Sequence, residues 1–592
     1  MLLLSSYFYA EAATITSTTT GGNWNDGVTW VGGVVPKSTD DVVIAQNATV
    51  TMDAANTSAG ILSLTVSSGS ILQTGTAAGN IRFYIKGNII NNGNINFWLN
   101  NTQGSGITLT GNSSWSGSGT WNLAQLFIGN FALEFGADIS ISINKSITVG
   151  SGSLNLSNKR SNYTFILSGP ENITLASANA AMFYGNIIVD KNSISYGIFA
   201  VTGTTTAYNT INVLGNITVN YGNELKAANY NLLDIRNMLS GSGKITGGTN
   251  SDIQISGNGN AVLFNSGGSG FRNFTLSRPN GATIDSTITI NQTLSIQNQA
   301  KLYMPAGKSA NGNQTFTVAG AITGDGYLAQ QNGTNAYQLT DLTLTGSAVA
   351  NLRFSQTTGE NIIHNLSVNK ASSTVNLLDA GFFQVKNTCT ITNGTFNING
   401  GTLKLTGTVL MNANGNLTGS TASNLIIGNE VSSSNATIYF NQTEAASRSL
   451  KTYTQTRNGT ITLGSALDIY NLVDINSTNS TNILNSASNL TLISTEAATA
   501  RVNNLGSAVI TDSVLVQRFI KGSDISRRSY RLLSSPVYQV QNANPGLRRY
   551  YFSRLQDQIL VTGAGGIANG FDASPVNGPT IWRYNEPAAN ST

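Results

Sequence analysis

The residue types that most often carry out chemistry are scarce in this chain of 592 residues, which has one cysteine, Cys389, and one histidine, His364. A single cysteine excludes an intramolecular disulfide, and one cysteine with one histidine cannot supply the ligands of a zinc site. A nucleophilic cysteine needs a histidine or a cationic environment. Cys389 lies instead between Thr388 and Thr390 in a strand-like patch. We interpret it as a small buried hydrophobe, and His364 as a strand or corner residue.

Acidic residues are also sparse, with 27 Asp and Glu in total. Glycoside hydrolysis needs two positioned carboxylates, and the clearest pair is Asp40-Asp41. Neighbours in a strand point to opposite faces, so this pair cannot converge on one substrate without a bulge. The segment 247–252 loosely resembles a calcium-binding nonapeptide, but it lacks the third glycine and does not repeat. We therefore expect no catalytic residue, no metal site and no cofactor.

The elements that would position any site are short strands. In the segment 394–411, Phe396 and Ile398 alternate with asparagines, a Gly-Gly corner follows, and Leu403 and Leu405 then alternate with Lys and Thr. Val409 and Met411 repeat the pattern. Alternation with a period of two places one set of side chains inside and the other in water. Such patches separated by Gly, Asn and Ser run through most of the chain, which predicts an all-β protein, a right-handed parallel β-helix (β-solenoid).

Composition supports a stack of coils. Hydrophobic residues make up 40% of the chain and charged residues 10%, with 62 Gly and 9 Pro. Disordered tails are richer in charge and proline, and in a solenoid each coil buries its apolar face against its neighbours. From Val516 onward, nine basic and four acidic residues give a net charge of +5, which leaves −1 for the rest. No basic stripe follows the solenoid, so we expect no nucleic-acid partner.

A longer repeat lies over the strand pattern. The segment 352–357, which contains Phe354, is echoed 86 residues later around Phe440, and a related segment with Phe264 precedes it by 90 residues. Repeats of 20 to 50 residues usually mark single units. We therefore expect modules of roughly 86–90 residues, each with several coils, within a solenoid that spans residues 61–515.

Both ends of the chain differ from this middle part. Residues 1–12 are mostly apolar and end in Ala10-Glu11-Ala12, a small-x-small pattern that predicts the remnant of a secretory signal peptide. No later segment approaches the roughly 18 to 20 apolar residues that cross a bilayer. We expect export and no transmembrane segment. Residues 516–592 hold five of the nine prolines and the arginine cluster, and we interpret them as an incomplete C-terminal β-rich module.

Residues 13–60 are expected to form an N-terminal cap and the first coils. The open end of a solenoid exposes unpaired strand edges and apolar interior, so it needs a cover. Trp24 and Trp30 are the candidates for this cover, with Asp40 and Asp41 just before the strand that begins at Val42. The alternative interpretation makes the two tryptophans a ligand-binding aromatic pair.

The two ends also carry a family resemblance. The segments 514–520, 527–537, 563–572 and 581–586 resemble a region of large secreted repetitive surface proteins of Bacteroidetes. The stretch from Asn23-Trp24-Asn25 to Asp40-Asp41-Val42 is similar to the opening of the same proteins. The resemblance implies export by the type IX secretion pathway, whose C-terminal sorting domain would follow residue 592. It implies roles such as adhesion or attachment to biomass, and it supplies no catalytic residues to carry over.

Three functions follow from these observations. The first is a secreted or cell-surface structural, adhesin-like protein that contacts extracellular polysaccharide or cell-surface glycans through many weak contacts. The second is a β-helix carbohydrate-active enzyme, either a polysaccharide lyase or a glycoside hydrolase. The third is a spacer for a domain beyond residue 592. In each case the secretion machinery is an expected partner.

Overall fold

A computed structural model describes residues 12–582 except 76–78, 100–103, 137, 150–153, 157–162, 170–171, 177–180, 184, 192–196, 200–208, 308–312, 332–338, 356, 358, 429–433, 476–480, 522–538, 542–543, 550 and 557–558. Most of the expected signal peptide and the segments 527–537 and 583–586 of the family resemblance lie outside the described residues.

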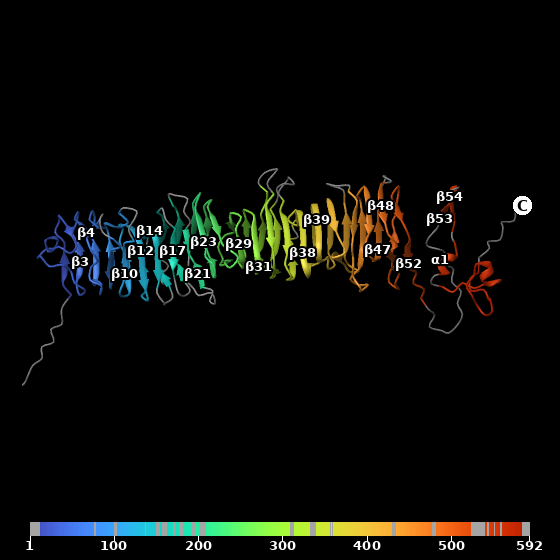
Figure 1. Cartoon of the computed structure of the whole chain (residues 1–592), viewed down its shortest axis with the longest axis horizontal. Coiled ribbons are helices and arrows are strands. Elements are labelled where there is room, and N and C mark those ends of the chain that lie inside the picture. Colours follow the sequence, from blue (N-terminus) through green and yellow to red (C-terminus); the bar gives the residue numbers. More distant parts are fainter. Residues whose placement is uncertain are drawn as a thin grey trace, which may run out of the picture.

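The chain forms a β-solenoid of about 18 turns, and its strands pair in parallel. Figure 1 shows the coils stacked side by side along the long axis, in sequence order from blue to red. This confirms the predicted solenoid. Its described residues form four sheets, and the strands belonging to each are given next.

The 28-stranded sheet contains β1 (Thr14–Thr16), β3 (Asp41–Ile44), β5 (Ser63–Val66), β8 (Ile89–Asn91), β11 (Ser113–Ser116), β13 (Leu133–Phe135), β15 (Leu154–Leu156), β18 (Ala181–Phe183), β21 (Asn209–Val213), β24 (Asn231–Ile235), β27 (Asp252–Ile255), β29 (Gly270–Leu276), β31 (Ile288–Ile296), β33 (Thr315–Val318), β34 (Ala321–Thr323), β36 (Asp341–Thr345), β37 (Ala350–Leu352), β38 (Ile362–Leu377), β39 (Phe382–Asn397), β40 (Thr402–Leu405), β41 (Thr408–Met411), β42 (Gly415–Thr418), β43 (Asn424–Ile427), β45 (Ser449–Gln455), β47 (Leu467–Asp474), β49 (Leu490–Leu492), β50 (Arg501–Val502) and β52 (Val514–Val516). The 16-stranded sheet contains β2 (Gly22–Asn23), β4 (Thr49–Met52), β6 (Ile71–Thr74), β7 (Arg82–Ile85), β9 (Asn94–Phe97), β10 (Gly106–Leu109), β12 (Thr120–Gly129), β14 (Ser140–Val149), β16 (Thr164–Leu167), β17 (Ile173–Ala176), β19 (Asn186–Val189), β20 (Gly197–Phe199), β22 (Ile217–Val219), β23 (Glu224–Ala227), β25 (Leu239–Ser240) and β26 (Lys244–Thr246). The two four-stranded sheets contain β28 (Val262–Phe264), β30 (Ala282–Ile284), β32 (Lys301–Met304) and β35 (Tyr327–Gln330), and then β44 (Ala436–Ile438), β46 (Gly459–Leu463), β48 (Asn482–Asn485) and β51 (Val509–Thr511).

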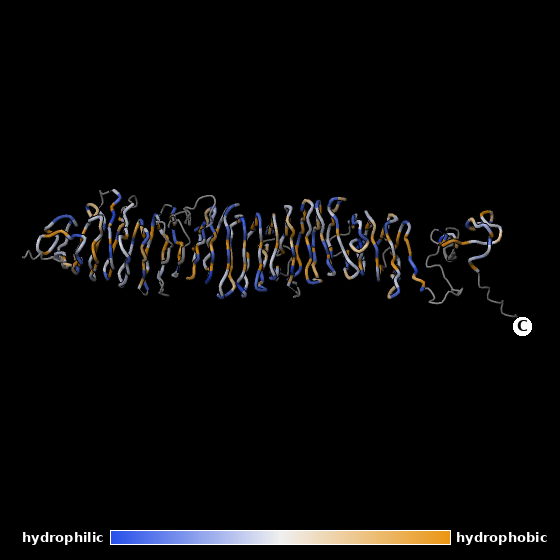
Figure 2. Tube along the Cα trace, turned by 90° about the horizontal axis from the view of Figure 1, so that it is seen from below, coloured by the Kyte–Doolittle hydropathy of each residue, from blue (hydrophilic) through white to orange (hydrophobic). Residues whose placement is uncertain are grey.

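The core is a continuous file of apolar side chains inside the coils. Phe396, Leu403 and Leu405 are buried as the alternation predicts, whereas Met411 is only partly buried against the core. Leu366, Cys389 and Val409 stand in register on three successive coils, so like positions stack on like positions. Figure 2 shows hydrophobic and hydrophilic residues alternating around the coils along the whole stack. Each coil is thus stabilised by burial against its two neighbours.

The strand register gives the length of a coil. Val262 pairs with Ala282, Ala282 with Leu302, Leu302 with Leu328, and Leu328 with Phe354. The shift of about 90 residues seen in the sequence therefore spans four coils. Phe354 lies in register with Val262, two residues from the Phe264 with which the sequence aligns it.

Three buried cations recur on the same scale. Arg278, Lys370 and Arg457 are each 0% exposed and follow one another at intervals of 92 and 87 residues. A fourth cation, Lys191, is also buried and precedes Arg278 by 87 residues. Each of the first three lies in, or just after, a strand of the 28-stranded sheet (β29, β38 and β45). Burial lowers the pKa of each of these three groups, because removal from water disfavours the charged form.

Backbone carbonyl groups offset this cost. Arg278 donates to the carbonyls of Ser256 and Asn260 on the preceding coil, and to those of Ile235 and Asn237 on the coil before that, at 2.9 to 3.1 Å. The other two cations also donate to carbonyls on two preceding coils. Lys370 donates to Thr345 and Gly320, and Arg457 donates to Gly428, Ser434 and Gly407. Each cation therefore ties three successive coils together.

Past residue 521, the described residues contain an antiparallel pair, β53 (Gln539–Gln541) and β54 (Asn544–Arg549), the single helical turn α1 (Ser553–Gln556) and the 3₁₀ turn η3 (Gly566–Asn569). The chain also has a 3₁₀ turn, η1 (Gly27–Thr29), near its start. The expected division at residues 60 and 515 stays a prediction. Among the described residues, no helix is long and apolar enough to cross a membrane.

Candidate functional site

The two candidate cap tryptophans are part of the core. Trp24 is 0% and Trp30 1% exposed, and their rings meet edge to face with centroids 4.9 Å apart. Trp30 Nε1 donates to the Trp24 carbonyl at 2.8 Å, and the Trp24 ring also meets Phe83 at 5.4 Å. Neither ring offers a face to an external ligand, which argues against the ligand-binding pair. The capping role stays a prediction.

Asp40 and Asp41 have separate partners. Asp40 is 6% exposed and accepts a hydrogen bond from the Lys37 backbone N–H at 2.7 Å. Asp41 begins β3 and accepts one from the Ser63 hydroxyl on the next coil. The two carboxylates serve local structure and do not face one substrate position.

His364 belongs to an outward polar row. Its Nδ1 lies 2.8 Å from Asp341 Oδ1 and 2.8 Å from Asn313 Nδ2, and Asn365 Nδ2 donates to the same Asp341 oxygen at 2.8 Å. Thr315, Asp341 and Asn365 stand in register on successive coils. The side chain is thus placed on a strand, as the sequence suggested.

A cluster around Glu360 was not anticipated from the sequence. Its carboxylate is 2.9 Å from Lys301 Nζ and accepts a hydrogen bond from the Tyr303 hydroxyl at 3.2 Å. Burial alone would raise the pKa of Glu360, but hydrogen bonds from Ser355 and Lys301 hold it below its usual value. Burial likewise opposes the charge on Lys301, and the Glu360 contact raises its pKa above the ordinary value. Both groups are therefore charged near neutral pH, which suits an ion pair better than a general acid or base.

Rows of hydrogen-bonded asparagines link successive coils. Asn122 Nδ2 donates to Asn96 Oδ1 at 3.1 Å, and Asn144 Nδ2 donates to Asn122 Oδ1 at 2.7 Å. A second row joins Asn397, Asn376 and Asn351 at 3.1 and 2.9 Å. These rows lie on strands of the sheets. Asn96 and Asn122 stand in register on successive coils, as do the three asparagines of the second row, whereas the register partner of Asn122 on the following coil is Ser142. Coils in register bring equivalent amides to within about 4.7–4.9 Å of each other.

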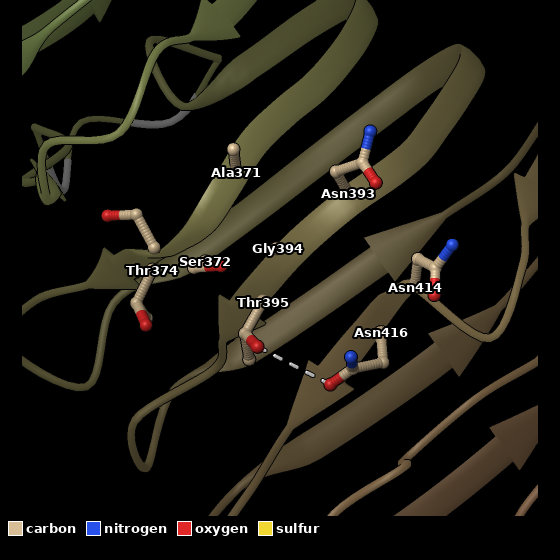
Figure 3. A pocket seen from close by; sticks show the side chains of 9 residues that line it. Ala371, Ser372, Thr374, Asn393, Gly394, Thr395, Asn414 and Asn416 are labelled. Atoms are coloured by element: carbon tan, nitrogen blue, oxygen red, sulfur yellow. Dashed lines mark hydrogen bonds between the residues drawn. The ribbon is translucent and has the colours of Figure 1, made fainter.

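One such polar surface is hollowed into a groove of about 520 Å³, here called the polar groove. Figure 3 shows its walls on three successive segments. Its lining residues are all uncharged: Ala371, Ser372, Ser373, Thr374, Asn393, Gly394, Thr395, Asn414 and Asn416. Thr374, Thr395 and Asn416 stand in register on three coils.

Hydrogen bonds fix the side chains of the polar groove. The Thr395 hydroxyl donates to Asn416 Oδ1 at 3.4 Å, the contact dashed in Figure 3, and Gln442 Nε2 donates to the same oxygen at 2.5 Å. Asn393 Nδ2 donates to Asn369 Oδ1 at 2.7 Å. Ser373 Oγ is buried and has no hydrogen-bond partner among the described residues.

The backbone beneath the polar groove is tightly turned. Ser372 has a φ of 53°, and Gly394 has a φ of 83° with the Lys370 carbonyl 2.3 Å from where a Cβ would lie. A side chain at Gly394 would therefore collide with the neighbouring coil. The buried Lys370 immediately precedes this segment in β38 and donates to the Thr345 and Gly320 carbonyls. The site offers hydroxyl and amide groups for hydrogen bonding and, among the residues lining it, no group that titrates near neutral pH.

The described residues contain no group of three or more His, Cys, Asp or Glu side chains that could hold a metal ion. Comparison with known protein families, curated proteins and solved structures finds no match for this chain.

Proposed function

We propose that the chain is a secreted or cell-surface structural protein of adhesin-like character, which contacts glycans through many weak polar contacts. The observation that carries the proposal is the polar groove together with the asparagine rows, because both present amide and hydroxyl groups in register along successive coils. Sugar hydroxyl groups are donors and acceptors of the same kind, so a glycan strand lying along the stack would meet a repeated set of partners.

Multivalency makes weak contacts effective. Linked sites act at a high effective concentration, and avidity exceeds the single-site affinity by about 10²–10⁴-fold when the geometry allows joint engagement. A solenoid holds its sites at fixed spacing, so little entropy is lost on engaging the second site.

Export is part of the same proposal. It is supported by the apolar segment 1–12, by the low charge of the chain and by the resemblance of both ends to secreted surface proteins of Bacteroidetes. The type IX pathway is the route that this resemblance suggests.

The test is retention of the purified full chain on insoluble polysaccharides and on a glycan array, followed by analysis of the products. We expect retention without new reducing or unsaturated ends. Asn416→Ala removes the acceptor shared by Thr395 and Gln442 and should weaken retention, whereas Asn503→Ala, an exposed asparagine outside the polar groove and the asparagine rows, is the matched control. Release of oligosaccharides would favour the carbohydrate-active enzyme, and absence of retention on every polysaccharide would contradict the glycan-binding role and favour the spacer.

A further inference from the structure

A second groove lies on the corners of four consecutive coils between β22 and β30, here called the tyrosine groove. It has a volume of about 290 Å³. Register connects its coils: Thr218 pairs with Ser240, and Phe264 pairs with Ile284. Its lining residues share a mixed apolar and polar character: Val219, Tyr221, Leu239, Ser240, Gly241, Ser242, Gly243, Ile245, Leu263, Asn265 and Asp285.

Two large, solvent-exposed side chains form the walls of the tyrosine groove. Tyr221 is 87% and Leu263 55% exposed, whereas the five tryptophans Trp24, Trp30, Trp98, Trp115 and Trp121 are all buried. A single exposed apolar residue needs no explanation, but two that face one groove form a patch that suits a ligand. Tyr221 and Leu263 belong to coils two steps apart, which separates their backbones by about 10 Å.

The floor is low because its residues are small. Gly241 has a φ of 89°, and a Cβ there would lie 2.1 Å from the Val219 carbonyl oxygen. No larger residue fits this corner, so the coil between the two walls stays recessed. Ser240 and Asn265 line the same floor. Ser240 Oγ is 2.9 Å from Thr218 Oγ1, and Asn265 Nδ2 donates to the Gly243 carbonyl at 3.2 Å.

Tyr221 is held in place by its turn. The Asn223 backbone N–H donates to the Asn220 carbonyl at 3.0 Å, and Asn223 Nδ2 donates to the Tyr221 carbonyl at 3.1 Å. Asn223 Oδ1 also accepts a hydrogen bond from the Lys191 backbone N–H at 2.8 Å. A ring on a braced turn loses little freedom on binding, which favours a stacking role.

We propose that the tyrosine groove is a binding subsite for a neutral pyranose ring of a glycan, which stacks on Tyr221 and contacts Leu263 from the other side. The aromatic ring stacks on the apolar face of the sugar ring, while the hydroxyl groups at the edge of the sugar reach Ser240, Asn265 and Asp285. The lining residues include the carboxylate of Asp285 and no Lys or Arg. This charge favours a neutral sugar over a uronic acid, because like charges repel.

The inference rests on the proposed glycan-binding function and sharpens it to one subsite. The test uses the full chain with three soluble probes: a β-glucan hexaose, a xylan hexaose and an oligogalacturonate. Titration calorimetry and saturation-transfer NMR measure binding. We expect at least one neutral probe to bind and the oligogalacturonate to bind at least about tenfold more weakly.

Variants locate the contact. Tyr221→Ala should weaken binding about tenfold, the equivalent of one stacking contact of about 1.4 kcal/mol. Tyr221→Phe keeps the ring face and should stay within about twofold of the natural protein. Phe131→Ala removes another exposed aromatic of the solenoid, 38% exposed, and should change nothing. Both positions are exposed, so the fold is expected to survive the substitutions.

Three outcomes would count against this inference, and they distinguish its failure from that of the proposed function. In the first, the natural chain is retained on polysaccharide, and Tyr221→Ala binds the neutral probe as tightly as the natural chain does. The tyrosine groove is then not the subsite, but the adhesin-like role stands. If the natural chain is not retained on any polysaccharide and binds none of the probes, both are overturned. Tighter binding of the oligogalacturonate than of the neutral probes contradicts the assigned sugar class.

Discussion

Replacing Arg278 with methionine tests the buried cations that tie coils together. The guanidinium group is fully buried and donates to four backbone carbonyls on two preceding coils. Methionine fills much of the volume but leaves these carbonyls without their donor. Each unsatisfied buried acceptor costs about 1–3 kcal/mol. Part of this loss is offset, because the buried charge and its desolvation penalty are removed. A net loss of about 3–5 kcal/mol is therefore expected.

The loss should be local, because a solenoid is stabilised coil by coil. A single free energy of global unfolding describes such a stack poorly, so native-state hydrogen exchange is the suitable assay. Amides of β24, β27 and β29 should lose protection by about a hundredfold or more, since 1.4 kcal/mol corresponds to a factor of ten. Amides of β4 and β6, many coils away, should be unchanged.

A matched variant controls for removal of charge. Lys521 pairs with Glu496 on the surface, where the two side chains are 71% and 65% exposed. Lys521→Met should leave protection in β24, β27 and β29 unaltered. Equal protection in Arg278→Met and in the natural protein would refute the view that carbonyl groups on the two preceding coils depend on this cation.

Three further predictions concern single side chains. Burial raises the pKa of the Cys389 thiol to about 12, so the native protein should not react with a thiol reagent at pH 8, while the unfolded protein should; fast labelling of native protein would place the thiol elsewhere. Trp24→Ala leaves a cavity at a fully buried ring and should cost about 3–5 kcal/mol, seen as lost exchange protection in the first coils, and unchanged protection there would contradict the packing around Phe83. The pKa of Glu360 is lower folded than unfolded, so its contribution to stability is full above the unfolded pKa and is lost as the pH falls through the folded pKa. Acid should thus open the coils around Glu360, and Glu360→Gln should remove that part of the pH dependence; an unchanged acid profile in the variant would show that the Lys301 contact is not its source.

Side-chain alternation was enough to predict the solenoid. Phe396, Leu403 and Leu405 are buried where a period of two places them, because each strand has one inner and one outer face. Met411 departs from the pattern and is only partly buried near the end of its strand. The sequence similarity that aligns Phe264 with Phe354 differs by two residues from the register of the coils, because a similar local sequence does not fix the register between coils.

The buried cations and the candidate functional surfaces were harder to predict than the fold. Arg278 and Arg457 would be placed in water by residue type alone, and only their fit to backbone carbonyls explains their burial. Together with Lys370 they recur at intervals of 92 and 87 residues, close to the spacing of the phenylalanine repeat in the sequence. Glu360 pairs with Lys301, 59 positions away in the chain, and Tyr221 and Leu263 line one groove from positions 42 residues apart, so neither pair leaves a local motif.

The most direct test of the multivalent role compares two affinities of the full chain. One is the affinity for an insoluble neutral polysaccharide, and the other is the affinity for a short soluble oligosaccharide of the same sugar. Many in-register weak sites predict retention on the polymer at least about a hundredfold tighter than binding of the oligosaccharide, with no released products. Equal affinities for the polymer and the oligosaccharide, or oligosaccharides released from the polymer, would contradict the account.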